Sequence, residues 1–536
     1  MPEDLSATTA TRPADESLSA LAPLRHPVFR MLWTTWMAAN TTMWMNDVAS
    51  AWLMTSLAPS PLWVALVQSA STLPVFLLGL PSGALADILD RRRYFMNTQF
   101  WVAGTSSIIC LTVLMGWMTA PLLLMLTFAN GIGLAMRWPV FAAIVPELVP
   151  RPQLPAALAL NGVAMNTSRI VGPLVAGAII AAAGSAWVFL LNAVLSLAAG
   201  FVIMRWRREH KESALGRERL GSAIRVGVQF VRQSRRMRAV LVRIALFFLH
   251  STALLALLPL VARGLPGGQA GTFTVLLAAM GVGAIIAALQ MPAIRRLLPL
   301  QTLILAGTTL QAGAAVGVAF APNIYVAVPG MFLAGVAWLA VANSLTVAAQ
   351  MALPDWVRAR GMSIYQMALM GSSALGAALW GLIATWTSIH DSLAIASVSS
   401  VLLMLLGQRL VADRGTEEDL TPSHVFKVPQ AQAPPRTGRI QVNIEYRIDP
   451  ARVAEFMELM QESRRSRMSQ GAREWQVLQD LHDPGRIVEQ ITDESWTEHL
   501  RRFDRVTAAD VQLRDRKLAF HIADAPPLVT RFVIDR

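Results

Sequence analysis

The sequence predicts an all-α membrane protein with twelve transmembrane helices in two six-helix bundles, followed by a small C-terminal α+β domain of the ferredoxin-like type. Apolar residues make up 54% of the 536 residues and charged residues only 15%, against a usual charged share of about 25%. Apolar runs of about 20 residues, the length that crosses a bilayer, recur through the first three quarters of the chain. After Asp413 the composition becomes polar.

The distribution of basic residues supports this topology. The turns after the second, fourth, sixth, eighth and tenth apolar runs hold 20 lysines and arginines, whereas the intervening turns hold only Arg263. Cytoplasmic loops of membrane proteins are enriched in Lys and Arg. Both termini are therefore expected in the cytoplasm.

Composition also excludes several classes of function. The net charge is +12, but residues 436–536 hold 17 basic and 17 acidic residues, so the surplus lies in residues 1–435, mostly in the turns between apolar runs. This pattern indicates topology and argues against a nucleic-acid partner. Cys110 is the single cysteine, and neither a metal-ligand spacing nor a phosphate-binding GxxxxGK[ST] motif occurs. No cofactor and no metal are expected.

Composition divides the chain into six segments. The N-terminal residues are polar and rich in Ala, Ser and Thr, which predicts disorder. A long polar stretch with a possible amphipathic helix over 219–231 separates the two groups of six apolar runs. The predicted segments are a disordered cytoplasmic tail (1–25), the first bundle (26–204), a cytoplasmic central linker (205–240), the second bundle (241–413), a linker (414–438) and the soluble domain (439–536).

The two groups of six apolar runs resemble each other in sequence. VPELVPRPQLPAALAL follows the fourth run and LPDWVRARGMSIYQ follows the tenth, and a glycine-bearing helix comes next in each case. Such repeats are typical of two related bundles around a site at the bilayer midplane.

The last hundred residues alternate between strand and helix patterns. IQVNIEYRI has strand periodicity, PARVAEFMELMQESRR has helical periodicity, and two further strands flank Asp483-Pro484-Gly485. A helix over 495–505 and a strand over 530–534 complete a βαββαβ order, which is ferredoxin-like.

The stretch GALADILDRRR ends the second apolar run. It resembles the signature between spans two and three of the major facilitator superfamily, in which Gly83, Asp87, Arg91 and Arg92 match, while Asp90 replaces a glycine. The resemblance covers residues 25–412. It implies a cytoplasmic gate, formed by these five residues, that closes the inner side of the protein.

Neighbouring segments resemble a narrower branch of that superfamily. LPVFLLGLPSG, FRMLW and DVASAWLM are similar to the enterobactin-exporter-like or transmembrane secretion effector group. This resemblance implies a secondary transporter of the bacterial inner (plasma) membrane that exports a small amphipathic compound, such as a siderophore, a drug or a metabolite. The soluble domain resembles the dimeric α+β barrel of antibiotic-biosynthesis monooxygenases, so it is expected to self-associate but not to act as an enzyme.

Three ionisable residues fall inside apolar runs: Asp47, Arg137 and Arg169. Charge at this depth costs at least about 2.5–3.5 kcal/mol, so each residue needs a partner, water or a function. They are the candidates for proton coupling. Asp47 alternatively forms a structural ion pair or lies near the outer water boundary, and Arg137 alternatively binds lipid phosphate.

Arg169 precedes GPLVAG, which resembles the antiporter signature of span five. Gly172 and Pro173 match its central pair, and a helix bend is expected there because proline removes a helix hydrogen bond.

Alternatives to proton-coupled export by alternating access remain open. An importer of the same fold has the same sequence features. A membrane-anchored sensor would use the soluble domain to bind a metabolite.

Overall fold

The computed structural model describes residues 21–58, 60–150, 153–206, 220–411, 419–423, 425–426, 429 and 438–534. Most of the predicted N-terminal tail and parts of both predicted linkers lie outside the described residues. The side chains and surroundings of a few helical residues lie outside the description too, among them Gly83 and Asp87 of the predicted gate.

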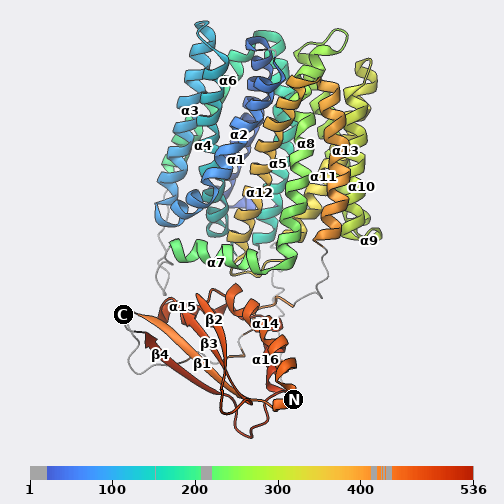
Figure 1. Cartoon of the computed structure of the whole chain (residues 1–536). Coiled ribbons are helices and arrows are strands. Elements are labelled where there is room, and N and C mark those ends of the chain that lie inside the picture. Colours follow the sequence, from blue (N-terminus) through green and yellow to red (C-terminus); the bar gives the residue numbers. More distant parts are fainter. Residues whose placement is uncertain are drawn as a thin grey trace, which may run out of the picture. The chain divides into compact units, whose positions relative to one another are not determined.

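Long helices dominate the described part of the chain (Figure 1). Those of twenty residues or more are α1 (Pro27–Leu57), α2 (Pro61–Ile88), α3 (Arg91–Leu114), α4 (Ala120–Leu148), α5 (Leu154–Ala183), α6 (Ser185–Arg205), α8 (Arg235–Gly264), α9 (Ala270–Leu297), α10 (Leu300–Ala319), α11 (Ile324–Met351), α12 (Arg358–Trp386) and α13 (Ile389–Leu410). The shorter helix α7 (Leu220–Gln233) confirms the amphipathic helix predicted in the central linker.

Ten of these helices are long and apolar enough to cross a membrane, as judged from the described residues. The other two are α1 and α3. Helix α1 carries Asn40, Asn46 and Asp47 along its length, and α3 begins with three arginines. Polar residues on these two helices lower their hydropathy, and most of those on α1 are turned toward other helices, because Asn40 and Asn46 are buried.

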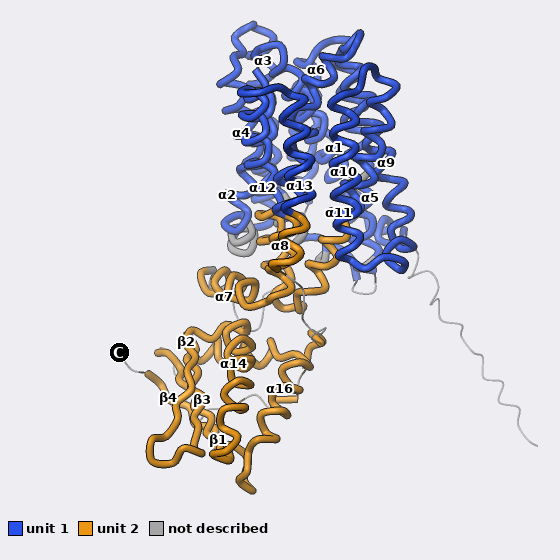
Figure 2. Tube along the Cα trace, turned by 45° about the vertical axis from the view of Figure 1, so that its right-hand side comes forward, with its two compact units in different colours: residues 1–211, 245–341, 369–403 blue, residues 212–244, 342–368, 404–536 orange. Residues whose placement is uncertain are grey.

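The chain forms two compact units (Figure 2). The first unit comprises residues 1–211, 245–341 and 369–403, and the second comprises residues 212–244, 342–368 and 404–536. These units cut across the predicted bundles, because the division passes through α8, α11, α12 and α13.

A shared apolar core joins the two halves of the helical part, α1–α6 and α8–α13, at one end of the first unit. All twelve long helices contribute to one cluster of buried side chains, with Met45, Val64 and Ile109 from the first half and Leu257 and Ala377 from the second. The cluster lies toward the end that carries the α1–α2 turn, which we call the α1–α2 end. Toward the opposite end the described residues form one cluster in α1 and α3–α6 and another in α9–α11.

Glycines allow the closest helix contacts of this unit. A Cβ atom on Gly335 of α11 would lie 1.9 Å from the carbonyl oxygen of Met280, and one on Gly283 of α9 would lie 2.0 Å from that of Phe332. The backbones of α9 and α11 therefore touch, as small residues permit in membrane helices.

Gly335→Ala is expected to destabilise the protein by about 1–3 kcal/mol, because the methyl group collides with backbone atoms that cannot rotate away. Thermal unfolding in detergent measures the effect. Gly313→Ala is the matched control, since nothing lies within 4 Å of its added Cβ. Equal melting temperatures of the two variants would contradict the contact.

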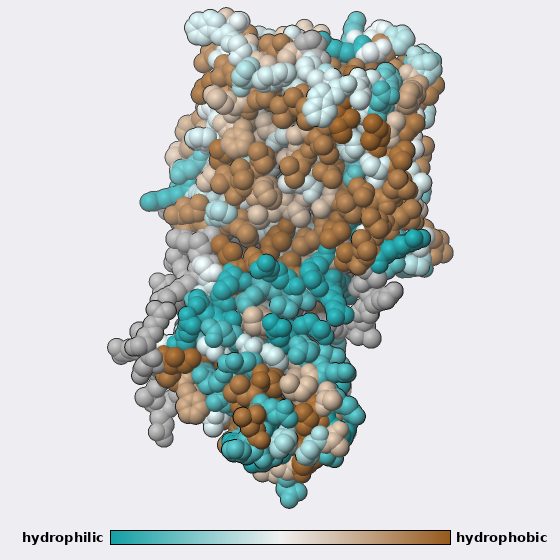
Figure 3. Space-filling view, viewed as in Figure 1, coloured by the Kyte–Doolittle hydropathy of each residue, from teal (hydrophilic) through white to brown (hydrophobic). Residues whose placement is uncertain are grey.

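The lipid-facing character of the helices is visible on the surface. Figure 3 shows apolar side chains over much of the visible face of the helical part. Leu289 is 77% exposed, Leu402 59% and Leu375 67%. Soluble proteins rarely expose apolar patches of more than a few hundred Å², so this surface requires a lipid solvent.

The C-terminal segment folds as an α+β domain within the second unit. Its strands are β1 (Arg439–Arg447), β2 (Glu474–Gln479), β3 (Arg486–Asp493) and β4 (Leu528–Ile534), and its helices are α14 (Val453–Ser469), α15 (Trp496–Asp504) and α16 (Ala508–Leu518). The sheet is antiparallel, with the order β2-β3-β1-β4. The predicted hairpin is confirmed as β2–β3.

A buried carboxylate organises the core of this domain. Glu489 is fully buried and lies 3.1 Å from the Lys517 ammonium and 3.5 Å from the Arg467 guanidinium. Ser463 and Trp475 also donate hydrogen bonds to it. Burial alone would raise the pKa of Glu489, but the charges of Lys517 and Arg467 hold this pKa well below its usual range. Glu489 is thus ionised in the folded domain.

The domain also contacts helix α7 within the second unit. Arg225 forms an ion pair of 2.7 Å with Glu494, and the Gln229 amide donates a 2.9 Å hydrogen bond to the Ala472 carbonyl. The Arg505 guanidinium lies 5.3 Å from the centre of the Trp356 ring in the α11–α12 turn. These contacts attach the domain to segments that adjoin α8 and α12.

Candidate functional site

Asp47 lies beside a cavity formed by helices of both halves. The cavity is lined by α1, α2 and α8. Its lining residues are Asp47, Ala51, Val64, Val67, Gln68, Ser71, Leu255 and Ala256. The Ser71 hydroxyl donates a 3.1 Å hydrogen bond to the Asp47 carboxylate. No cation pairs with this carboxylate among the residues that the structure describes, so the structure does not show the alternative of an ion pair.

Arg137 belongs to α4 and contacts α1 at Ala39, about two helical turns before Asp47. Its side chain is 3% exposed and donates a 3.2 Å hydrogen bond to the Ala39 carbonyl. Its guanidinium lies 5.4 Å from the centre of the Trp36 ring, which stacks on Phe141. A backbone carbonyl and an aromatic face thus take the place of a carboxylate partner, and Arg137 and Asp47 are not brought together.

Arg169 lies between two tryptophans from opposite halves of the chain. Its guanidinium is 4.3 Å from the centre of the Trp338 ring on α11 and 5.4 Å from that of the Trp44 ring on α1. Phe248 of α8 packs edge-on against Trp338 at 5.6 Å. This arrangement places Arg169 against tryptophans that are distant from it in the sequence.

Gly172 positions one of these tryptophans. A Cβ atom on Gly172 would lie 2.6 Å from the Trp44 Cβ atom and 3.0 Å from the Thr41 carbonyl oxygen. The glycine therefore lets α1 approach α5 closely, one turn away from Arg169. Pro173 lies inside α5, which continues to Ala183.

A buried amide cluster in the first six helices was not predicted. Asn192 of α6 donates to Ser106 of α3 at 2.9 Å and to Asn46 of α1 at 3.4 Å, and Asn130 of α4 donates to Ser106 at 3.1 Å. The sequence feature that could have predicted this cluster is the presence of asparagines inside apolar runs. Such hydrogen bonds between membrane helices stabilise packing.

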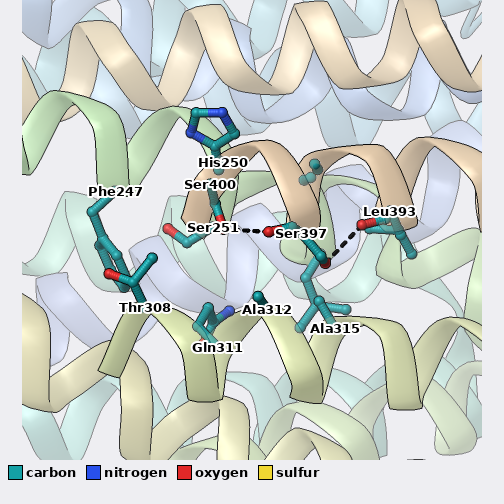
Figure 4. Close-up of a pocket in the computed structure, with 13 residues that line it drawn as sticks. Phe247, His250, Ser251, Thr308, Gln311, Ala312, Ala315, Leu393, Ser397 and Ser400 are labelled. Atoms are coloured by element: carbon teal, nitrogen blue, oxygen red, sulfur yellow. Dashed lines mark hydrogen bonds between the residues drawn. The ribbon is translucent and has the colours of Figure 1, made fainter. Parts of the chain in front are cut away.

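The second half contains a further cavity, between α8, α10 and α13. In Figure 4, Gln311 of α10 extends toward Ser251 and Ser400 across it. Ser400 and Ser397 bond to carbonyls of their own helix, whereas the Gln311 amide and the Ser251 hydroxyl have no partner among the described residues. His250 is held by the Leu246 carbonyl at 2.7 Å.

The predicted gate is described only in part. The surroundings of Gly83 and the side chain of Asp87 lie outside what the structure describes. Asp90 is the N-cap of α3, where its carboxylate accepts a 2.8 Å hydrogen bond from the Arg93 backbone N–H. Arg92 donates to the Met204 carbonyl at the end of α6. Asp90 thus begins a helix, a role that its place before three helical arginines could have indicated.

The chain is similar to known transporters. The transmembrane secretion effector family matches residues 18–536. The staphyloferrin A transporter of Staphylococcus aureus (strain NCTC 8325 / PS 47) is 22% identical over 68% of this chain and 91% of its own length. The uncharacterized MFS-type transporter YfiS of Bacillus subtilis (strain 168) is 25% identical over 69% of this chain and 91% of its own length.

Solved structures share the fold of the helical part. A bacterial homologue of the human lysosomal transporter Spinster, in an inward-facing and unoccupied conformation, covers 73% of this chain and 96% of its own, with a TM-score of 0.57 at 12% identity. The nucleoside transporter NupG covers 72% of this chain and 100% of its own, with a TM-score of 0.53 at 13% identity. The chain therefore belongs to the transmembrane secretion effector family and is a multi-pass secondary transporter of the major facilitator type.

Proposed function

We propose that the protein exports a small amphipathic compound from a bacterial cell across the inner (plasma) membrane, in exchange for protons, by alternating access. In this proposal all twelve long helices are spans, both termini are cytoplasmic and the α1–α2 end is extracellular. The 20-to-1 distribution of basic residues over alternate turns supports this orientation. A relative named as a siderophore transporter supports a siderophore or similar metabolite as the cargo.

Asp47 is the observation that carries the proton-coupling proposal. Its cavity joins α1 and α2 of the first half to α8 of the second. Val64, Val67 and Ala256 of its lining also belong to the apolar core at the α1–α2 end. A charged carboxylate is costly against such a wall, and a protonated one is tolerated. Protonation of Asp47 would therefore favour closure of the α1–α2 end, and deprotonation would favour its opening.

Arg137 and Arg169 remain candidates for proton coupling, and Gly172 and Pro173 for a bend in α5. Gly83, Asp87, Asp90, Arg91 and Arg92 form the proposed cytoplasmic gate. The bond from Arg92 to the end of α6 and the capping role of Asp90 support a fixed α2–α3 turn on which such a gate could act.

The six predicted segments remain our proposed domain boundaries. For the soluble domain we propose self-association and a monooxygenase-like fold without catalysis. Strand β4 is an edge of the sheet and exposes Leu528, Phe532 and Val533 by 62%, 53% and 43%. An edge strand with exposed apolar side chains is suited to pairing with a second copy.

Metabolite profiling of a strain lacking the protein tests the export proposal. The transported compound is expected to accumulate in the cells and to disappear from the medium, since its way out is lost. Complementation with the intact chain restores the compound to the medium. Depletion of a compound from the cells together with its accumulation in the medium would instead show an importer.

A further inference from the structure

We infer that Arg169, Trp44 and Trp338 form a binding site for an organic carboxylate, and hence that the transported compound is an anion with an apolar or aromatic flank. The inference rests on the proposed transport of a small compound and names its chemical class. We call these three residues the Arg169 site.

The Arg169 site lies at the depth where charge is most costly. Arg169 is at the middle of the candidate span Ala156–Ala183, and Trp338 is at the middle of the span Ile324–Met351. Trp44 is near the middle of α1. A cation held at the centre of a bilayer requires a function or a counter-charge.

Two buried hydrogen-bond donors of the site lack an acceptor. Both a guanidinium and an indole N–H only donate hydrogen bonds. Nε of Arg169 and Nε1 of Trp44 are buried and have no acceptor within the described part of the chain. No carboxylate pairs with Arg169 among the described residues either. A buried donor without an acceptor is costly, so these two groups call for an oxygen atom that the chain does not supply.

The chemistry of the site favours a carboxylate with an apolar flank. The planar guanidinium matches the two oxygens of a carboxylate. The rings of Trp44 and Trp338 supply flat apolar surface beside it, together with Phe248, which packs on Trp338. Trp44 comes from the first half of the chain and Trp338 from the second, so a bound anion would contact both halves.

Two other arginines that contact tryptophans each have a backbone carbonyl as an oxygen acceptor. Arg263 lies 5.1 Å from the centre of the Trp52 ring, but its guanidinium also donates a 2.7 Å hydrogen bond to the Thr55 carbonyl. Arg137 donates from one terminal nitrogen to the Ala39 carbonyl, although its Nε, like that of Arg169, has no acceptor among the described residues. Among these three tryptophan-contacting arginines, Arg169 is the one without an oxygen acceptor in the described part of the structure.

An oxyanion at this site could also come from a lipid headgroup. The placement of the site between helices of both halves, at mid-depth in the bilayer, favours a free ligand over a headgroup phosphate, because headgroups lie at the membrane surface. The test below separates the two sources.

Binding of 2-naphthoate and of its uncharged analogue 2-naphthamide to the full chain in phosphatidylcholine nanodiscs tests the inference. Isothermal titration calorimetry is expected to show the acid binding at least about ten-fold more tightly than the amide, since charge-assisted hydrogen bonds add to the same ring contacts. Arg169→Gln is expected to abolish this preference. Arg263→Gln, the matched control, is expected to retain it.

Absence of a preference for the acid in the wild-type chain, including absence of binding by either probe, would overturn the inference without any variant. So would an acid preference that survives in a folded Arg169→Gln protein. Loss of acid binding in phosphatidylglycerol nanodiscs would assign the site to lipid and overturn it as well, whereas unchanged binding supports a free ligand.

The outcomes for the site and for export are separable. A neutral exported compound, found by profiling, together with no preference for the acid would reject the Arg169 site and leave export standing. A clear acid preference together with unchanged cell and medium metabolites would retain the site and reject export.

Discussion

Asp47→Asn is expected to abolish proton-coupled export while leaving the protein inserted in the membrane. The amide cannot take up or release a proton, so the cavity between α1, α2 and α8 keeps one charge state throughout the cycle. Asparagine preserves the volume of the side chain and can still bond to Ser71, which lies 3.1 Å from the carboxylate. Packing at the α1–α2 end should therefore persist.

Intracellular retention of the compound in a complemented deletion strain measures this effect, with membrane abundance quantified in parallel. Asp391→Asn is the matched control, because Asp391 is exposed in the first turn of α13. The control should export as well as the wild type. Normal export by a fully expressed Asp47→Asn protein would remove Asp47 from the mechanism.

Glu489→Gln is expected to destabilise the soluble domain by about 3–5 kcal/mol, because it leaves the buried Lys517 and Arg467 charges without their anion. Amides of β3 should exchange hydrogen at least about a hundred-fold faster in the full-length protein. Glu458→Gln on the exposed face of α14 is the control and should leave exchange unchanged. Equal protection of β3 in both variants would contradict the role of Glu489.

The same carboxylate gives the domain a defined pH dependence. The pKa of Glu489 is lower in the folded domain than its ordinary value of 4.5. Its contribution to stability is therefore fully present above about pH 4.5 and is lost progressively as the pH falls below that value. Hydrogen exchange of β3, corrected for intrinsic rates, measures this loss between pH 3 and 6 in the wild type. The stability of Glu489→Gln should depend less on pH, because the protein then has about one fewer carboxyl group whose protonation is linked to folding.

Much of the architecture could be predicted because it depends on local patterns. Apolar runs and alternating basic turns predicted the long helices, and alternating strands around Asp483-Pro484-Gly485 predicted the β2–β3 hairpin. Helix α16 was missed because its apolar residues are sparse. Its signal was a capping box in which Thr507 and Asp510 bond reciprocally with the backbone.

The candidate sites could be predicted only one residue at a time. Charge inside an apolar run singled out Asp47, Arg137 and Arg169, but their neighbours come from helices that are distant in the sequence. Trp338 follows Arg169 by more than a hundred residues, and only the packing of α5 with helices of the second half brings them together. No local rule encodes such a pairing.

Proton movement in proteoliposomes tests the central claim of proton-coupled antiport most directly. Purified protein is reconstituted with a pH-sensitive dye in an acidic lumen, and the compound identified by profiling is added outside. Antiport predicts that the lumen becomes more alkaline as the compound enters, and that Asp47→Asn removes this signal. Entry of the compound with an acidifying lumen, or with no change in luminal pH, would contradict it.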